Sequence, residues 1–425
     1  MGKYGGDAYD FMRFESNSTL KMYEKESMPE ADKPCRRQVN LASSYQRKTS
    51  HDEKGHIKKV QGLGFKVQGK RNETFKNLKI NWRIGWDDGW NRKKTAGERK
   101  SLSGIFGGSI MKRLAFPEFF EKYQCILGEG AVIERLRRNS EFDLDPHTVN
   151  SAFIYDKDKR TALSEIYRQY LGIGFKYNLP LLLSTPTWRA SRERIEKAGY
   201  EKSDVNGDNF RFLDGIRKSY GEYANKIVIC GLLSCRGDAY NQSEALTSND
   251  AHEFHSWQAN RLAEAGVDFL LAATLPALSE ATGLATALAA TGKPYIISIL
   301  MRSEGTMLDR TPLKDAISII DSDVNPKPIA YMANCTHASI FKTAIMHATH
   351  SSSTVRKRVA GLLANTAALN PEELDDSEEL VEEDPQTFGK SVANLHGELG
   401  MKILGGCCGT DERHIDNLAK RLVIV

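Results

Sequence analysis

Three cysteines stand in two short motifs that are suited to holding a metal ion. Cys335 lies in the stretch ANCTHAS, and Cys407 and Cys408 are neighbours in LGGCCGT. Thiolates are soft ligands, and three of them suit a tetrahedral Zn²⁺ site whose fourth position is open to water or substrate. Neighbouring side chains of an extended strand point to opposite faces, so the adjacent pair needs an irregular turn to reach one ion. The glycines that flank the pair permit such a turn.

The alternative is that these cysteines are unreactive core residues, since free cysteine is among the most buried residue types. A Cys-Cys pair flanked by glycines at the end of an apolar run favours the metal site, and the CxxC spacing of a redox pair is absent. We therefore predict Cys335, Cys407 and Cys408 as metal ligands. Through the bound Zn²⁺ they are also the predicted catalytic residues.

The cysteines belong to a longer pattern of short apolar runs between residues 111 and 425. Each run has the length of a buried strand, and amphipathic stretches such as 160–177 and 248–266 alternate with them. Eight such units predict a closed (β/α)8 barrel of the TIM type, with an open doubly wound sheet as the alternative. The runs are YQCILG (123–128), LPLLLST (179–185), KIVICGLL (226–233), VDFLLAA (267–273), PYIISIL (294–300), PIAYMA (328–333), RVAGLLA (358–364) and MKILGG (401–406).

The barrel places the candidate ligands together. Catalytic side chains of this fold gather at the carboxyl ends of the strands. Cys335 is expected just beyond the sixth strand, and Cys407 and Cys408 just beyond the eighth. These strands lie two apart in a closed barrel, so the three thiols are expected to converge at one rim. Asn365 ends the seventh strand and is a candidate polar contact of the substrate.

Residues 1–110 differ from the rest of the chain. They carry 23 Lys and Arg against 13 Asp and Glu, whereas residues 111–425 carry 36 against 42. No long segment has a clean helical or strand period. We predict a basic extension that is poorly ordered or loosely docked, followed by the barrel at 111–425. Trp82, Trp86 and Trp90 among basic residues leave a nucleic-acid-binding arm as a less favoured alternative.

Composition sets the broad class. Hydrophobic residues make up 40% and charged residues 27% of the 425, which is typical of a soluble globular protein. No apolar run reaches the roughly 18 residues of a membrane span. The start, MGKYGGDAYDFMRFE, resembles neither a secretory signal nor a transit peptide, and seven cysteines do not suggest a disulfide scaffold. A cytoplasmic protein with reduced thiols is expected.

The motifs together resemble a known family. Asn334-Cys335-Thr336, followed by Gly405-Gly406-Cys407-Cys408-Gly409-Thr410, is similar to the zinc-dependent homocysteine S-methyltransferases. The resemblance continues in DERHIDNLAKRL at the end of the chain, GVDFLLAATLPALSEA at 266–281 and LGEGAVIERL at 127–136, and covers about 120–425.

The resemblance implies a (β/α)8 barrel and a Zn²⁺ held by three cysteines, with an acceptor thiol as the fourth ligand. It implies methyl transfer from an activated donor to homocysteine, giving methionine. S-methylmethionine or S-adenosylmethionine are the expected donors, ahead of betaine or methyltetrahydrofolate. Glu129, Gly130, Asn334 and Asn365 are the implied substrate-binding residues, and no membrane or nucleic-acid partner is expected.

Two departures from the family pattern bear on the substrate. Glu129 stands where the family has Asp before glycine, and Ala273 stands where it has a Glu before Thr-x-Pro. That carboxylate would hold the amino group of the acceptor. A diverged member that binds or methylates another thiol, or a non-catalytic thiol-binding barrel, is therefore the alternative function.

Other candidate sites favour ordinary structural roles. Arg236 and Asp238 after the third run suggest a surface salt bridge, with a substrate contact as the alternative. The pairs His252/His255 and His347/His350 lack the Glu of a zincin motif and are expected to be exposed on helices. The acidic run 370–384 lacks the spacing of a calcium loop and is expected to form a solvated loop and helix after the seventh strand.

Overall fold

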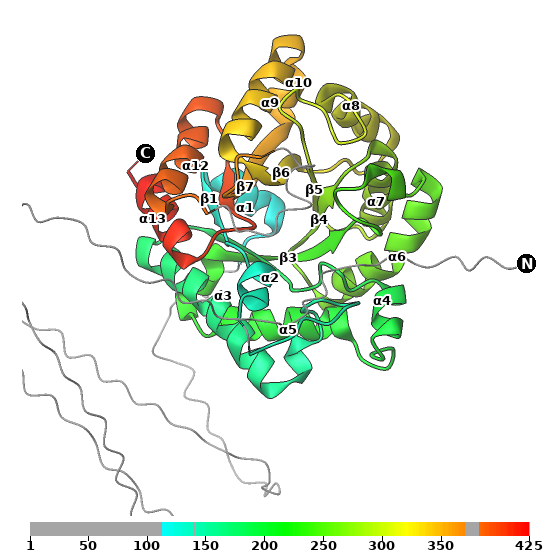
Figure 1. Ribbon diagram of the computed structural model, residues 1–425, viewed down its shortest axis with the longest axis vertical. Coiled ribbons are helices and arrows are strands. Elements are labelled where there is room, and N and C mark those ends of the chain that lie inside the picture. Colours follow the sequence, from blue (N-terminus) through cyan, green and yellow to red (C-terminus); the bar gives the residue numbers. More distant parts are fainter. Residues whose placement is uncertain (1–112, 140, 370–381, 425) are drawn as a thin grey trace, which may run out of the picture. The chain divides into compact units, whose positions relative to one another are not determined.

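The computed structural model describes residues 113–139, 141–369 and 382–424 (Figure 1). The predicted basic extension and its tryptophans lie outside these ranges, as does the acidic run up to residue 381. The predicted boundary between residues 110 and 111 therefore stays a prediction.

Eight parallel strands close into a barrel in the order in which they occur in the chain. The closing pair is β1 with β8, where Ile126 is opposite Ile403. The predicted (β/α)8 barrel is confirmed, and the open sheet is excluded. The strands are β1 (Ile126–Gly128), β2 (Leu181–Ser184), β3 (Ile227–Ser234), β4 (Phe269–Leu275), β5 (Tyr295–Ile299), β6 (Ala330–His337), β7 (Val359–Asn365) and β8 (Ile403–Gly406).

Helices surround the strands, as Figure 1 shows. The long helices α3 and α6 cover the two amphipathic stretches predicted at 160–177 and 248–266, and left-handed residues Asn178 and Gly266 end them. The α-helices of the described residues are α1 (Phe116–Lys122), α2 (Ile133–Arg137), α3 (Lys157–Tyr177), α4 (Arg192–Lys197), α5 (Val205–Lys218), α6 (Ser248–Ala265), α7 (Leu278–Ala290), α8 (Leu313–Asp323), α9 (Ala338–Ser351), α10 (Ser353–Arg358), α12 (Pro385–Leu399) and α13 (Glu412–Leu422). Short 3₁₀ turns span Phe153–Tyr155, Gly221–Lys226 and Gln242–Glu244.

Apolar side chains fill two layers, because every strand is buried on both faces. One layer lies between the strands and the surrounding helices, and the other fills the barrel itself. Leu183 belongs to the outer layer and its neighbour Leu182 to the inner one. This alternation explains why the strand sequences are almost continuously apolar and carry no period of two.

Helix α1 closes the amino-terminal end of the barrel. Phe116 stacks on Phe269, the first residue of β4, with ring centroids 3.7 Å apart. Arg113 forms a 2.6 Å ion pair with Asp268, immediately before that strand. Phe119 is fully buried in the inner layer. The open end of the barrel is therefore the carboxyl end of the strands, where the cysteines were predicted.

Two of the expected positions are wrong in detail. Strand β6 runs to His337, so Cys335 lies within the strand and not just beyond it. His255 is 1% exposed, because its face of α6 packs on α7 and its Nε2 lies 3.0 Å from a carboxylate oxygen of the buried Glu280. His252 and His347 are exposed, as expected.

Candidate metal centre

The three predicted ligands come together at the carboxyl end of the barrel. Strand β7 lies between β6, which carries Cys335, and β8, which precedes Cys407 and Cys408. The Sγ atoms of Cys335, Cys407 and Cys408 all lie within 4.8 Å of one another, and those of Cys335 and Cys408 are 3.9 Å apart. Cys335 is buried, Cys407 partly buried and Cys408 exposed, so the cluster opens toward solvent on one side.

Cys335 and Cys407 are joined as a disulfide, with Cα atoms 5.5 Å apart. Metal ligation needs thiolates. Binding of one ion by all three cysteines therefore requires this pair to be reduced.

Cys335 occupies a bulge in β6. The β6–β7 register pairs Asn334 with Leu363 and Thr336 with Ala364, so Cys335 is an extra residue between them. Its φ of +50° is in the left-handed region that non-glycine residues rarely adopt. The bulge interrupts the alternation of side chains along the strand and turns the thiol toward β8.

The Cys407-Cys408 pair lies in the predicted irregular turn after β8. The N–H of Cys407 donates to Ala364 O at 2.6 Å, and the carbonyl of Cys408 accepts from the N–H of Thr366 at 3.2 Å. Gly409 has a φ of +83°, and a Cβ there would overlap the Thr366 side chain. The turn is therefore held by backbone hydrogen bonds to Ala364 in β7 and to Thr366 just after it. Glycine is required at position 409 by its backbone conformation and by the lack of space for a side chain.

Thr410 ties this turn to the loop after β1. Its hydroxyl donates to the Cys407 carbonyl at 2.7 Å and accepts from the N–H of Ala131 at 3.0 Å. Tyr170 then holds the Ala131 carbonyl at 2.6 Å. A Cβ on Gly130 would come within 2.7 Å of that tyrosine hydroxyl, so the predicted glycine is needed for close packing.

Glu129 follows β1 at the same end of the barrel and is 6% exposed. One carboxylate oxygen accepts from the N–H of Ser184 at 3.1 Å. The other oxygen, Oε2, is buried and has no hydrogen-bond partner within the described residues. Burial raises the pKa of Glu129 to about 8, although the hydrogen bonds with Ser184 act in the opposite direction.

Asn334 precedes Cys335 in β6, Asn365 contacts Cys335 from the end of β7, and both are buried. The carboxamide oxygen of Asn334 accepts from the N–H of Thr274 at 2.9 Å and from the Ser298 hydroxyl at 2.7 Å. The Nδ2 of Asn365 donates to the Cys335 carbonyl at 3.1 Å. All four predicted substrate-binding residues thus lie at the same end of the barrel as the cysteines.

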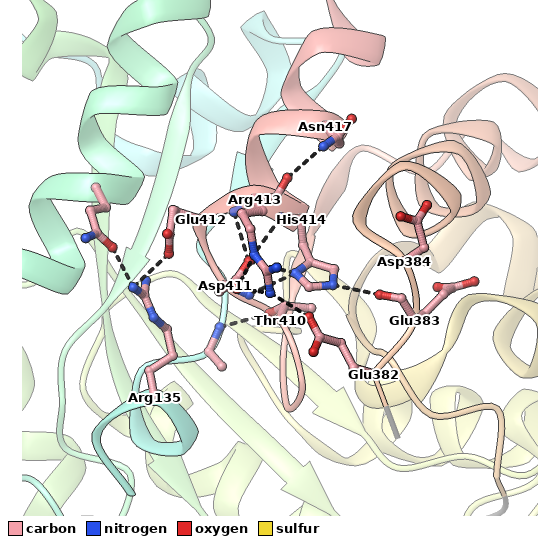
Figure 2. A network of polar contacts seen from close by, with 12 residues as sticks. Arg135, Glu382, Glu383, Asp384, Thr410, Asp411, Glu412, Arg413, His414 and Asn417 are labelled. Atoms are coloured by element: carbon pink, nitrogen blue, oxygen red, sulfur yellow. Dashed lines mark hydrogen bonds and ion pairs between the residues drawn. The ribbon is translucent and has the colours of Figure 1, made fainter. Parts of the chain in front are cut away.

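A polar network anchors the helix that follows the cysteine turn (Figure 2). Asp411 caps α13 by accepting from the backbone N–H groups of Arg413 and His414. Burial raises the pKa of Asp411, but hydrogen bonds from Arg413 and His414 outweigh it and hold the value at about 2. Arg413 also binds Glu382 at 2.6 Å, and His414 Nε2 lies 2.9 Å from the Glu383 carbonyl.

The comparisons with known proteins agree with this arrangement. The family model described as homocysteine S-methyltransferase matches residues 126–422. The chain belongs to this family.

Betaine--homocysteine S-methyltransferase 1 of Bos taurus is 22% identical over 341 residues, which span 74% of this chain and 76% of the relative. Homocysteine S-methyltransferase YbgG of Bacillus subtilis is 26% identical over 185 residues, or 43% of this chain and 56% of the relative.

Solved structures of the family share the fold. The metallated form of the homocysteine methyltransferase MmuM from Escherichia coli superposes with a TM-score of 0.57 at 19% identity, covering 72% of this chain and 98% of that one. Its oxidised form gives a TM-score of 0.57 at 18% identity, covering 71% and 97%.

The departures from the family pattern are visible in the barrel. Ala273 is 6% exposed and belongs to the apolar layer inside the barrel, so a longer side chain at this position would extend into the interior. Arg236 forms an exposed surface ion pair as expected, but its partner is Glu193, at 3.4 Å, and not Asp238. Asp238 accepts from the N–H of Tyr240 in its own loop.

One side chain at the carboxyl end of the barrel was not predicted from the sequence as part of the site. Trp188, in the loop after β2, is partly buried and donates its indole N–H to Thr274 Oγ1 at 3.0 Å. Thr274 Oγ1 also lies 2.7 Å from the Ser234 hydroxyl. The signal was present in the sequence, because Trp188 comes three residues after the predicted run 179–185, where barrel loops carry functional groups.

No helix within the described ranges combines the length and apolar character that crossing a bilayer requires.

Proposed function

We propose that this chain transfers a methyl group from an activated donor to the thiol of homocysteine, giving methionine, at a Zn²⁺ held by Cys335, Cys407 and Cys408. The observation that carries the proposal is the convergence of three thiols, one in β6 and two in the turn after β8, within 4.8 Å of one another. Membership of the homocysteine S-methyltransferase family supports the same reaction.

The donor set fits the proposed ion. Three thiolates form a soft site with one position left over, and the exposed side of Cys408 is where an acceptor would approach. When bound, the ion supplies positive charge that favours the deprotonated form of an acceptor thiol, whose pKa is otherwise near 8.5. The thiolate sulfur then forms a bond to the donor methyl carbon, and the bond between that carbon and the donor breaks with its electron pair leaving on the donor.

Glu129 is the proposed contact of the acceptor's ammonium group. Its Oε2 is buried without a hydrogen-bond partner within the described residues, whereas Oε1 is fixed by Ser184. In the ionised form of Glu129, a buried acceptor without a donor is costly, and an ammonium group would supply the missing hydrogen bond. Gly130 allows the backbone beside Glu129 to pack against Tyr170. The carboxamide oxygen of Asn334 already has two donors, so we propose Glu129 as the principal contact.

The proposed donor is a sulfonium compound, S-methylmethionine or S-adenosylmethionine. Loss of a methyl group converts a sulfonium ion to a neutral thioether, which makes it a good leaving group. Betaine is the competing donor, because the name of the bovine relative states its use there.

A screen of donors and acceptors tests the proposed function. Reduced protein, with its zinc content measured, would be incubated with homocysteine and each of S-methylmethionine, S-adenosylmethionine, betaine and methyltetrahydrofolate. Methionine would be quantified by mass spectrometry. We expect methionine with a sulfonium donor and about one zinc per chain. A zinc-loaded protein that forms no methionine with any donor would contradict the proposal.

A second candidate function is supported by Ala273. Ala273 has no group that could bind an ammonium, so Glu129 is the proposed contact for an amino group. The apolar surroundings of Ala273 suit a thiol acceptor that carries no ammonium. Including 3-mercaptopropionate and 2-mercaptoethanol among the acceptors distinguishes the two functions. Faster turnover of these thiols than of homocysteine would favour the second.

A further inference from the structure

Two strands near the cysteine cluster contain residues in an unfavourable backbone conformation. Thr274 in β4 has a φ of +56° and Cys335 in β6 has a φ of +50°. Both sit where the pairing with the next strand shifts, between Ala272 and Leu275 and between Asn334 and Thr336. A left-handed conformation is unfavourable at a non-glycine residue and persists only where the surroundings enforce it.

Asn334 connects the two irregularities. The shift in β4 changes the regular β4–β5 ladder around Thr274, whose buried N–H needs an acceptor. The carboxamide oxygen of Asn334 supplies it at 2.9 Å, from β6, two strands away. The same oxygen accepts from the hydroxyl of Ser298 on the intervening strand at 2.7 Å, so the residue before Cys335 is fixed to β4 and β5.

Asn365 holds Cys335 from the other side. It is 3% exposed, and its Nδ2 donates to the Cys335 carbonyl at 3.1 Å. The bulge removes Cys335 from the regular β6–β7 ladder, and this hydrogen bond satisfies its carbonyl without a ladder partner. The carboxamide of Asn334 therefore fixes the residue before Cys335, and the carboxamide of Asn365 binds Cys335 directly.

We propose that Asn334 and Asn365 form a carboxamide clamp that keeps Cys335 in its bulged conformation and so positions its thiol for metal binding. The inference rests on the proposed zinc function, and it gives both residues a positioning role that the family resemblance does not. Without the clamp, Cys335 can relax into an extended ladder, which turns its side chain away from Cys407 and Cys408. Partners of metal ligands typically contribute 10- to 100-fold to metal affinity.

The test measures zinc affinity of the reduced full-length chain by competition with a chromophoric chelator. The variants are Asn334→Ala, Asn365→Ala and the equal-volume Asn365→Asp, which replaces the donor to the Cys335 carbonyl by an oxygen. Asn209→Ala is the matched control, because Asn209 is a fully buried carboxamide that donates to the carbonyls of Ser151 and Val205 on a different part of the barrel. Melting temperatures of the metal-free proteins and the visible absorption of the Co²⁺ forms are recorded alongside.

The clamp predicts zinc affinity about 10- to 100-fold weaker in each site variant and weaker Co²⁺ absorption from a distorted tetrahedral site. Asn209→Ala should lower the melting temperature of the metal-free protein and keep wild-type zinc affinity.

Zinc affinity within about threefold of wild type in Asn365→Asp, with ordinary Co²⁺ absorption, would overturn the clamp. If an alanine variant does not fold, Asn365→Asp decides the question, because it keeps the volume of the side chain. A wild-type chain that binds no zinc would overturn the proposed function together with the clamp, whereas zinc-binding wild type with unaffected variants would overturn the clamp alone.

Discussion

At the scale of single residues, Glu129 is a carboxyl group whose pKa is strongly altered by its surroundings. Burial raises its pKa to about 8, so the group is largely protonated in the free protein at neutral pH and ionises as the pH rises through that value. Because an ammonium group is held by the carboxylate form, binding of an amino acid should strengthen with rising pH up to about 8.

Methionine, the proposed product, tests this dependence because it has the ammonium group without a titrating thiol. Its affinity for the wild type should rise by up to about tenfold per pH unit between pH 6 and 7.5, and Glu129→Gln should bind it weakly at every pH. Calorimetric titration would measure both. Glu121→Gln, on α1 at the other end of the barrel, is the control. A wild-type affinity that does not change with pH would show that Glu129 does not hold the amino group.

The cysteine cluster makes a prediction about metal content. Reduced wild-type protein should contain about one Zn²⁺ per chain, and Cys407→Ser should lose most of it, because the variant keeps only two of the three thiolates. Elemental analysis after gel filtration measures the ratio. Cys125→Ser is a suitable control, since Cys125 is a partly buried thiol outside the cluster. Full zinc retention in Cys407→Ser would mean that other ligands hold the ion.

Ala273 makes a prediction about acceptor choice. A charge-assisted hydrogen bond is worth roughly 1.5–3 kcal/mol, or about ten- to a hundredfold in affinity. Ala273→Glu should therefore increase kcat/KM for homocysteine relative to 2-mercaptoethanol, and the ratio cancels any general damage to the barrel. Efficient use of homocysteine by the wild type with no gain in the variant would assign the ammonium pocket to Glu129 alone.

At the scale of the elements, the hydroxyl of Thr410 joins the turn after β8 to the loop after β1. Thr410 accepts from the N–H of Ala131 and donates to the carbonyl of Cys407. Thr410→Val keeps the shape of the side chain and leaves the buried N–H without its acceptor, which should cost about 1–3 kcal/mol of unfolding free energy.

Urea unfolding of reduced protein would measure this loss, and zinc affinity should fall with it because Cys407 loses a restraint. Thr343→Val is the matched control, since the hydroxyl of Thr343 donates to a backbone carbonyl on the exposed side of α9. Equal stability losses in the two variants would show that the Thr410 bridge contributes nothing specific to the turn.

At the scale of the whole molecule, the barrel is closed by elements that all lie beyond residue 111. Strand β1 pairs with β8, and α1 fills the amino-terminal end of the barrel through Phe116 and Phe119. Each of these elements begins after residue 111, and so do the three cysteines. A protein that starts at Met111 should therefore fold and bind zinc as the full chain does.

Circular dichroism, melting temperature and zinc content of the 111–425 protein test this independence. We expect values close to those of the full chain, and a further truncation to residue 124, which removes α1, should lower stability strongly because it exposes the inner layer at Phe269. An insoluble 111–425 protein would show that residues 1–110 contribute to the core.

The sequence by itself determined the architecture and the end of the barrel at which the three cysteines meet. Eight apolar runs, spaced by amphipathic stretches, were enough to predict a (β/α)8 barrel, because strands buried on both faces are short and continuously apolar. The three cysteines could be placed at one rim without coordinates, because strand order in this fold follows chain order. These features are local or follow from the topology.

The tertiary structure alone decided how these residues are held. Whether His255 is exposed depends on which face of α6 meets Glu280 on α7. The pKa of Glu129 depends on how completely the neighbouring strands remove it from water. The bulge at Cys335 depends on where β7 pairs with β6 and on the Asn365 side chain from β7, which takes up the freed carbonyl of Cys335. These properties arise from contacts between residues far apart in the chain, and no local pattern encodes them.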